Sequence, residues 1–244
     1  MNKAGRFRSD FAYRGLSNKD YALETSLNRL GRKPEKLEKH LIMNFRKYAH
    51  SVLDKRDSFW TVLALAQHHG VPTRLMDWTF SPYVALHFSC ESTDKFNKDG
   101  IIWCVDFKKI HGLLSDPFKW ELKAYDTRGY SVEMLDRVCK NLEEFDAHRT
   151  DDDFVLFFEP PSTNQRIINQ FALFSMMSSP IARLDLWLKR HPDYYKTIII
   201  PKELKWEIRD KLDQVNITER VLFPGLDGLG AWLNRYYGPG PSVK

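Results

Sequence analysis

The chain has 244 residues, of which 43% are hydrophobic and 14% aromatic, which is enough for a packed core and excludes a disordered chain. The formal net charge of +5 permits contact with phosphate groups but is also ordinary for a globular protein. The three cysteines show no zinc-binding or disulfide spacing, and no stretch approaches the roughly 18 apolar residues of a membrane span. We therefore expect a cytoplasmic protein that does not enter the membrane.

A short strand is predicted at the start of the chain, over residues 11–15 (FAYRG), because aromatic residues alternate there. Arg14 would point to the opposite face from Phe11 and Tyr13. We expect Gly15 to end the strand in a turn and to let a ligand approach the backbone closely. An arginine in this position can hold a phosphate or a carboxylate through two hydrogen bonds, although it could also be a surface arginine on an edge strand.

Three helices and a loop are predicted next. Apolar residues recur at helical spacing over residues 34–53, and a second helix over residues 58–69 has Ser58 as its N-cap. Gly70 ends that helix, and Pro82 opens a third one that continues to residue 92. The intervening residues, broken by Gly70 and Pro72, are predicted to be a loop.

Polar side chains are concentrated in this loop and at the two helix ends beside it. They are Gln67, His68, His69, Thr73, Arg74, Asp77, Thr79 and Ser81. A helix C-terminus favours a protonated imidazole, and a helix N-terminus with hydroxyl residues can bind phosphate, although Thr79 and Ser81 could equally serve only as caps. We interpret this segment as one side of a functional site.

The second half of the chain supplies the remaining strands and helices. Strands are predicted over residues 101–107, 154–158, 171–176 and 197–200, and helices over residues 132–147, 202–212 and 217–222. A short helical turn places Arg166 and Gln170 on one face. With no repeat or flexible linker, we predict one α+β domain over residues 1–244, with a small mixed or antiparallel sheet flanked by helices.

Several motifs together resemble the FRG domain family. They are Tyr13-Arg14-Gly15, the segment QHHGVPTRLMDWT over residues 67–79, Arg166 with Gln170 and Phe174, and Leu222-Phe223-Pro224. The chain departs from the family pattern at Met76, which replaces a leucine, and at Ala172, which replaces a glycine and would matter only where the backbone needs a positive φ. The resemblance covers most of the chain and implies a bacterial or phage conflict-system protein, such as a toxin or a defence effector.

A second resemblance is to the ADP-ribosyltransferases of the arginine type. Arg14-Gly15, then Thr79 and Ser81 before Ala85 and Phe88, and finally Gln170 occur in that family's order. The resemblance implies an ADP-ribosyltransferase-like fold and NAD as the cofactor. Phosphate would be held by Arg14, Gly15, Arg74 and Arg166, with Thr79 and Ser81 on the nicotinamide side and Gln170 at the catalytic position. Because Gln170 is neutral, either Glu159, Asp77 or Glu24 supplies the negative charge, or the fold binds a nucleotide without turning it over.

Two other classes of function stay open at this point. In a hydrolase or nuclease, His68 or His69 would be the general base and Asp77 would orient it. We predict no metal site there, because neighbouring helix residues point about 100° apart. Alternatively, the basic charge and three tryptophans, Trp120, Trp206 and Trp232, could serve a non-catalytic module that binds nucleic acid or a partner protein.

Overall fold

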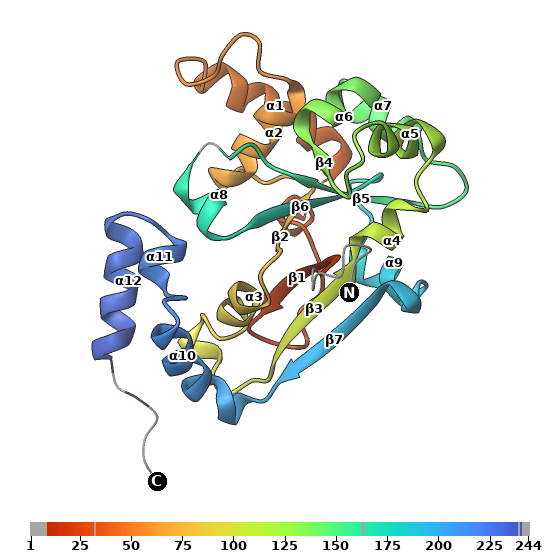
Figure 1. The fold of residues 1–244 in the computed structure, drawn as a ribbon. Helices are drawn as coiled ribbons and strands as arrows, with labels where there is room; N and C mark the ends of the chain where they lie inside the picture. Colours follow the sequence, from red (N-terminus) through yellow and green to blue (C-terminus); the bar gives the residue numbers. More distant parts are fainter. Residues whose placement is uncertain (1–8, 32, 163, 239, 241–244) are drawn as a thin grey trace.

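A mixed seven-stranded sheet runs through the computed structural model, which describes residues 9–31, 33–162, 164–238 and 240, with strand order β4-β5-β6-β2-β1-β3-β7 (Figure 1). The strands are β1 (Phe11–Leu16), β2 (Leu75–Thr79), β3 (Gly100–Asp106), β4 (Tyr130–Ser131), β5 (Val155–Glu159), β6 (Ala172–Met177) and β7 (Tyr195–Ile200). β4 pairs with β5 in parallel, and the other neighbours are antiparallel. The predicted α+β class with a mixed sheet is confirmed.

The strands form where β-branched and aromatic residues are concentrated. β3, with the sequence GIIWCVD, is buried along its whole length because strands β1 and β7 flank it and side chains pack on both faces. The sequence prediction missed β2, which lies in the expected loop. Only five residues long and interrupted by Asp77, β2 has little strand character of its own, and five residue pairs with β6 hold it in the sheet.

Helices pack around the sheet, and seven of them form two groups at different parts of it. The helices are α1 (Pro34–Tyr48), α2 (Phe59–His68), α3 (Pro82–Ser89), α4 (Phe107–His111), α5 (Asp116–Ala124), α6 (Val132–Val138), α7 (Leu142–Ala147), α8 (Gln165–Asn169), α9 (Leu184–Lys189), α10 (Lys205–Gln214), α11 (Glu219–Leu222) and α12 (Leu226–Tyr237). Figure 1 shows α1, α2, α5, α6 and α7 gathered near β4, β5 and β6, whereas α3 and α10 lie beside the β1–β3 part of the sheet. No helix within the described residues is long and apolar enough to cross a bilayer.

Side-chain caps explain where several helices begin. The hydroxyl oxygen of Ser58 accepts a hydrogen bond from the backbone N–H of Thr61 at 3.1 Å, which confirms the predicted start of α2. The single helix expected over residues 132–147 is instead two helices. Cys139 is extended, and the side chain of Asn141 caps α7 by accepting from the backbone N–H of Glu144 at 2.9 Å. Apolar periodicity continues across this break and conceals it.

A buried histidine makes the stability of this fold sensitive to acid. The side chain of His111 is 2% exposed, its Nε2 accepts a hydrogen bond from the backbone N–H of Phe157 at 2.9 Å, and its Nδ1 lies 3.0 Å from the carbonyl oxygen of Arg128. With Nε2 as an acceptor, the ring is neutral and donates from Nδ1. Burial lowers the pKa of His111 to about 4.

We expect the free energy of unfolding to fall as the pH drops from 7 to 5, by about 2 kcal/mol on account of His111 alone. The unfolded imidazole, with a pKa near 6.5, takes up a proton in this interval, whereas the folded imidazole stays neutral until the pH approaches 4. Urea titrations at the two pH values measure the difference. In a His111→Gln variant this contribution should disappear, and an unchanged pH dependence in that variant would contradict the assignment.

Candidate functional site

A cleft opens where β1 and β2 separate. These strands are paired only at Tyr13 and Thr79, whereas β1 follows β3 over six residue pairs and β2 follows β6 over five. The cleft has a volume of about 310 Å³, at the lower end of the range for small-molecule sites. Its polar lining comes from β1, β2, the end of α3, and α8, and consists of Tyr13, Arg14, Ser17, Tyr21, Asp77, Thr79, Glu91, Ser92, Arg166 and Gln170.

Arg14 reaches from β1 across the opening to β2. Its Nη1 donates to the backbone carbonyl oxygen of Asp77, and its buried Nε has no hydrogen-bond partner within the described chain. Burial lowers the pKa of Arg14, which the charge of Asp77 partly opposes. A guanidinium that is desolvated but has no carboxylate partner is well suited to binding an anion.

Asp77 places a carboxylate at the cleft through a chain of side-chain hydrogen bonds. Gln67 Nε2, from the last turn of α2, donates to Asp77 Oδ2 at 3.0 Å. Gln67 Oε1 in turn accepts from the Thr73 hydroxyl at 2.6 Å, so the amide orientation is fixed at both ends. The end of α2 therefore positions Asp77, which stays exposed to solvent.

The two predicted hydroxyl residues have different roles. Thr79 is 3% exposed and lines the cleft, and its Oγ1 accepts from the backbone N–H of Ser81 at 3.0 Å. Ser81 is the N-cap of α3, because its hydroxyl oxygen accepts from the backbone N–H of Val84 at 3.4 Å, and it does not line the cleft. The cap function predicted for Ser81 is confirmed, whereas its expected contact with a cofactor stays a prediction.

Gln170 and Arg166 form the side of the cleft that comes from the second half of the chain. Gln170 Nε2 donates to the backbone carbonyl oxygen of Leu222 at 3.0 Å, which ties the end of α8 to α11. The Arg166 guanidinium lies 4.9 Å from the ring centroid of Phe223 and makes no ion pair with any residue that the structure describes. At Ala172 the family's glycine is not required, because the positive φ of 48° belongs to the preceding residue, Phe171.

Gly15 serves helix packing as well as the cleft. It lies inside β1 rather than in a turn, where its Cα faces the backbone of α3. A Cβ atom at this position would overlap with the carbonyl oxygen of Ala85 and lie 2.8 Å from the backbone nitrogen of Ser89. The expected turn at Gly15 is therefore corrected: the glycine is needed because α3 crosses β1 at close range.

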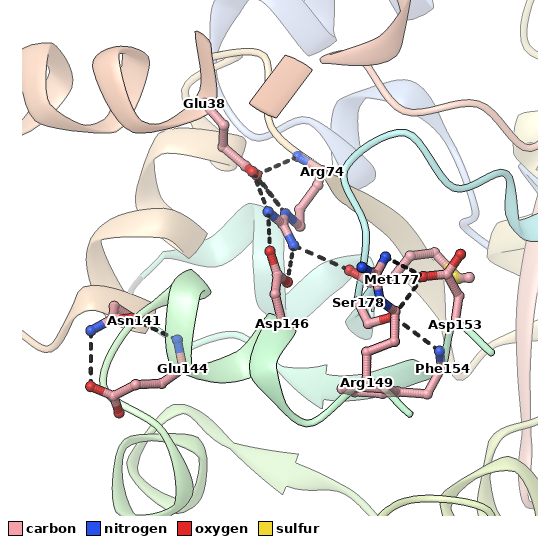
Figure 2. A network of polar contacts seen from close by, with 10 residues as sticks. All are labelled: Glu38, Arg74, Asn141, Glu144, Asp146, Arg149, Asp153, Phe154, Met177 and Ser178. Carbon is pink, nitrogen blue, oxygen red and sulfur yellow. Dashed lines mark hydrogen bonds and ion pairs between the residues drawn. The ribbon is translucent and has the colours of Figure 1, made fainter. Parts of the chain in front are cut away.

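Arg74 is held in a buried ionic network outside the cleft, which corrects the expectation that it binds a ligand phosphate. Figure 2 shows its guanidinium between Glu38 of α1 and Asp146 of α7, at 2.6 Å and 2.5 Å. The side chain of Arg74 is 4% exposed. Burial opposes the charge of Arg74, but the two carboxylates outweigh it and raise the pKa of the guanidinium. Arg74 thus joins the first part of the chain to α7.

The adjacent histidines are not arranged as a catalytic pair with Asp77. His68 Nε2 lies 2.7 Å from the side-chain nitrogen of Asn164, and His69 stacks on Phe45 with 6.4 Å between ring centroids. Neither imidazole makes a hydrogen bond or an ion pair with a carboxylate in the described part of the chain, and neither lines the cleft. Burial lowers the pKa of His68, and Arg166 lowers it further. The charge of Asp77 opposes this lowering, but no hydrogen bond joins the predicted general base to its orienting carboxylate in the described part of the chain.

Glu91 is the carboxylate among the cleft-lining residues that the sequence prediction missed. It follows the C-cap of α3, lines the cleft beside Arg14 and Gln170, and has a pKa that burial raises. Its sequence context, the end of a helix, carries no signal for a site. Of the three carboxylates suggested from the sequence, Asp77 lines the cleft, whereas Glu24 and Glu159 do not.

Other kinds of site find less support in the described residues. No three His, Cys, Asp or Glu side chains among them are grouped to hold a metal ion. The three tryptophans do not form one surface: Trp120 on α5 is 67% exposed, Trp206 packs edge-on against Phe96, and Trp232 stacks on Tyr236. A stacking platform for bases needs aromatic rings in a row along a basic groove.

Comparison with known proteins places the N-terminal part of the cleft in a family. The FRG domain family model matches residues 9–98, which include β1, β2, α3 and Glu91. No curated protein and no solved structure matches the chain, so no similarity to ADP-ribosyltransferases is shown. Arg166 and Gln170, on the opposite side of the cleft, lie beyond the matched residues. Residues 9–98 of this chain match the FRG domain family, and residues beyond the match contribute Arg166 and Gln170 to the cleft.

Proposed function

We propose that the cleft binds NAD and breaks the bond between its nicotinamide ring and ribose, either to transfer ADP-ribose to an acceptor or to release it into water. The single observation that carries this proposal is the state of Arg14, which lines the cleft and has, among the described residues, neither a hydrogen-bond partner for its buried Nε nor a carboxylate bound to it. Such a group is ready to bind a phosphate oxygen.

The other buried arginines make the state of Arg14 informative. Arg74 is paired with Glu38 and Asp146, and Arg209 and Arg235 are both paired with Glu219. This fold therefore compensates a buried guanidinium with carboxylates where the role is structural. Arg166 also enters the cleft without an ion pair among the described residues, so two guanidinium groups are available for a pyrophosphate.

The cleft combines both signs of charge with aromatic side chains, as a nicotinamide dinucleotide requires. Its pyrophosphate is anionic and its nicotinamide ring is cationic, and Asp77 offers a carboxylate opposite the arginines. Tyr13, Tyr21, Trp78 and Phe88 line the same space and provide surfaces for a planar ring. A volume of about 310 Å³ suits one nucleotide half in the cleft, with the other half lying toward solvent.

The order of the cleft residues along the chain supports the same proposal. Arg14, Thr79 and Gln170 line one cleft and follow the order of the arginine, hydroxyl and late Gln or Glu positions in arginine-type ADP-ribosyltransferases. In this proposal Thr79 contacts the nicotinamide side and Gln170 positions the ribose. A protein that consumes NAD, or that modifies a protein or nucleic-acid acceptor with it, suits a toxin or a defence effector of a conflict system.

Replacing Arg14 by alanine is expected to weaken NAD binding by about 10- to 100-fold, because a charge-assisted hydrogen bond to phosphate contributes roughly 1.5–3 kcal/mol. Isothermal titration calorimetry with NAD measures the affinity, and chromatography of released nicotinamide measures cleavage. Transfer to an acceptor is followed with labelled NAD in cell extract.

Arg220→Ala is the matched control. Arg220 is an exposed arginine that lies over Trp232, outside the cleft, and its replacement should leave NAD affinity unchanged. Arg14→Lys, which keeps the charge without the planar fork, should be intermediate. Absence of both NAD binding and nicotinamide release in the wild-type protein would overturn the proposal.

A further inference from the structure

We propose that Glu91 is the catalytic carboxylate of this cleft: it stabilises the positive charge that develops on the ribose and accepts the proton of the attacking group. This inference rests on the proposed NAD cleavage and names the residue that supplies the negative charge which this reaction needs. Gln170, at the position where the resemblance places a Glu or Gln, is neutral and donates its amide to Leu222. The charge must therefore come from another residue of the cleft.

Glu91 lies in the cleft because it directly follows the end of α3. Cys90 is the C-cap of α3, and Glu91 follows it at once, facing the same space as Arg14 and Arg166. Glu91 also borders a second depression, which Glu219 and Arg235 line on the side of α11 and α12. It thus stands between the cleft and the C-terminal helices, in a partly buried position.

Glu91, which is partly buried, differs from the buried Glu38 and Glu219 in having no partner among the described residues. Glu38 is bound by Arg74, and Glu219 by Arg209 and Arg235. Glu91 makes no hydrogen bond or ion pair within the described part of the chain, although Arg166 and Arg209 lie close enough to influence its charge. A partly buried carboxylate that lines a cleft and has no ion-pair partner is available to a ligand, and ionisable groups with perturbed pKa values cluster at functional sites.

Two other carboxylates are less suited to this role. Asp77 lines the cleft, but it is exposed and its Oδ2 accepts a hydrogen bond from Gln67. A solvent-exposed charge interacts weakly with a developing cation because water screens it. Glu159, at the end of β5, has a pKa that burial raises, as Glu91 does, but it does not line the cleft.

In the proposed reaction, nicotinamide leaves the ribose and a nucleophile takes its place. The bond between the ribose C1′ and the nicotinamide nitrogen breaks, and its electron pair leaves with the nitrogen, so that nicotinamide departs as a neutral molecule. C1′ and the ring oxygen share the positive charge, which the ionised Glu91 stabilises. Water, or an acceptor hydroxyl or amine, forms the new bond to C1′ and gives a proton to the Glu91 carboxylate, which releases it to solvent.

The pH dependence follows from the groups around Glu91. Burial raises its pKa, Arg209 of α10 and Arg166 of α8 oppose that rise, and Glu219 of α11 reinforces it. The reaction needs the ionised form, so kcat should fall as the pH drops through the raised pKa of Glu91. This decline would lie above the usual range of an exposed glutamate.

Glu91→Gln tests the inference in the full chain. We expect kcat for nicotinamide release to fall by at least about 100-fold, the acidic decline of the pH profile to disappear, and the dissociation constant for NAD to change by less than about 3-fold. Glu159→Gln is the matched control, since it removes a carboxylate whose pKa burial also raises but which lies outside the cleft, and it should keep wild-type kcat. Glu91→Asp should keep the acidic decline with an intermediate kcat.

The measurements distinguish a wrong role for Glu91 from a wrong assignment of NAD cleavage. Near wild-type kcat in Glu91→Gln, while Arg14→Ala still loses NAD binding, would overturn the role of Glu91 alone. A fall in thermal stability of Glu91→Gln that accounts for its lost activity, with the same acidic decline in the remaining activity, would indicate a structural role and also overturn it. A wild-type protein that neither binds nor cleaves NAD would overturn both.

Discussion

Arg74→Met is expected to lower the free energy of unfolding by about 3–5 kcal/mol, because it removes the cation from between the buried carboxylate of Glu38 and the partly buried carboxylate of Asp146. The Glu38 side chain is 3% exposed and the Asp146 side chain 32% exposed, and both depend on Arg74 for charge compensation (Figure 2). Burial already raises the pKa of Glu38, so without Arg74 its ionised form would be strongly disfavoured. Urea unfolding followed by tryptophan fluorescence measures the loss.

Two further variants identify the cause of this loss. Adding Glu38→Leu to Arg74→Met should restore part of the stability, because the most deeply buried carboxylate is then no longer left unpaired. Arg56→Ala, which removes an exposed ion pair with Asp54, should shift the unfolding midpoint little. If Arg74→Met keeps wild-type stability but loses NAD binding, Arg74 belongs to the site after all.

Gly15→Ala is expected to destabilise the fold by about 3 kcal/mol or more and to weaken binding in the cleft. The added methyl group would overlap with backbone atoms of Ala85 and approach the backbone of Ser89, which cannot rotate away as a side chain can. α3 must then move off β1, and the cleft residues at both of its edges, Arg14 and Glu91, move with these elements. Thermal unfolding and NAD titration of the variant measure the two effects.

A second glycine in the chain provides the control. Gly230 lies within α12, where an added Cβ meets nothing within 4 Å, so Gly230→Ala should stabilise the protein by up to about 1 kcal/mol through helix propensity. Gly15 has no positive φ, so an effect at Gly15 reports packing rather than backbone strain. Wild-type stability in Gly15→Ala would show that α3 does not need this close approach.

Local sequence signals predicted those elements whose residues carry the information themselves. The apolar repeat and the Ser58 cap define α2, and the concentration of β-branched and aromatic residues defines β3. β2 was missed because its strand conformation depends on β6, almost 100 residues away in the chain, rather than on its own five residues. The break between α6 and α7 was missed because periodicity is insensitive to a single capping residue such as Asn141.

The polar residues predicted for the site divide into those that line the cleft and those that do not. Arg14, Asp77, Thr79, Arg166 and Gln170 were predicted, and they line one cleft. Arg74 was predicted as a phosphate-binding residue on the same evidence. Whether an arginine can bind a ligand, however, depends on which carboxylates of the protein already pair with it. Those of Arg74 come from α1 and α7. A sequence motif does not include partners from distant helices. A family pattern also contains structural residues and ligand-binding residues together, without distinguishing them.

By itself, the sequence determined the α+β class, the match of residues 9–98 to the FRG domain family and the chain order of the cleft residues, because composition, periodicity and motifs are local properties. The tertiary structure decided which of the polar residues share a space. It separated Arg74, His68 and His69 from the cleft and brought Glu91 into it, since burial, charge compensation and the lack of a partner exist only once distant elements have packed together.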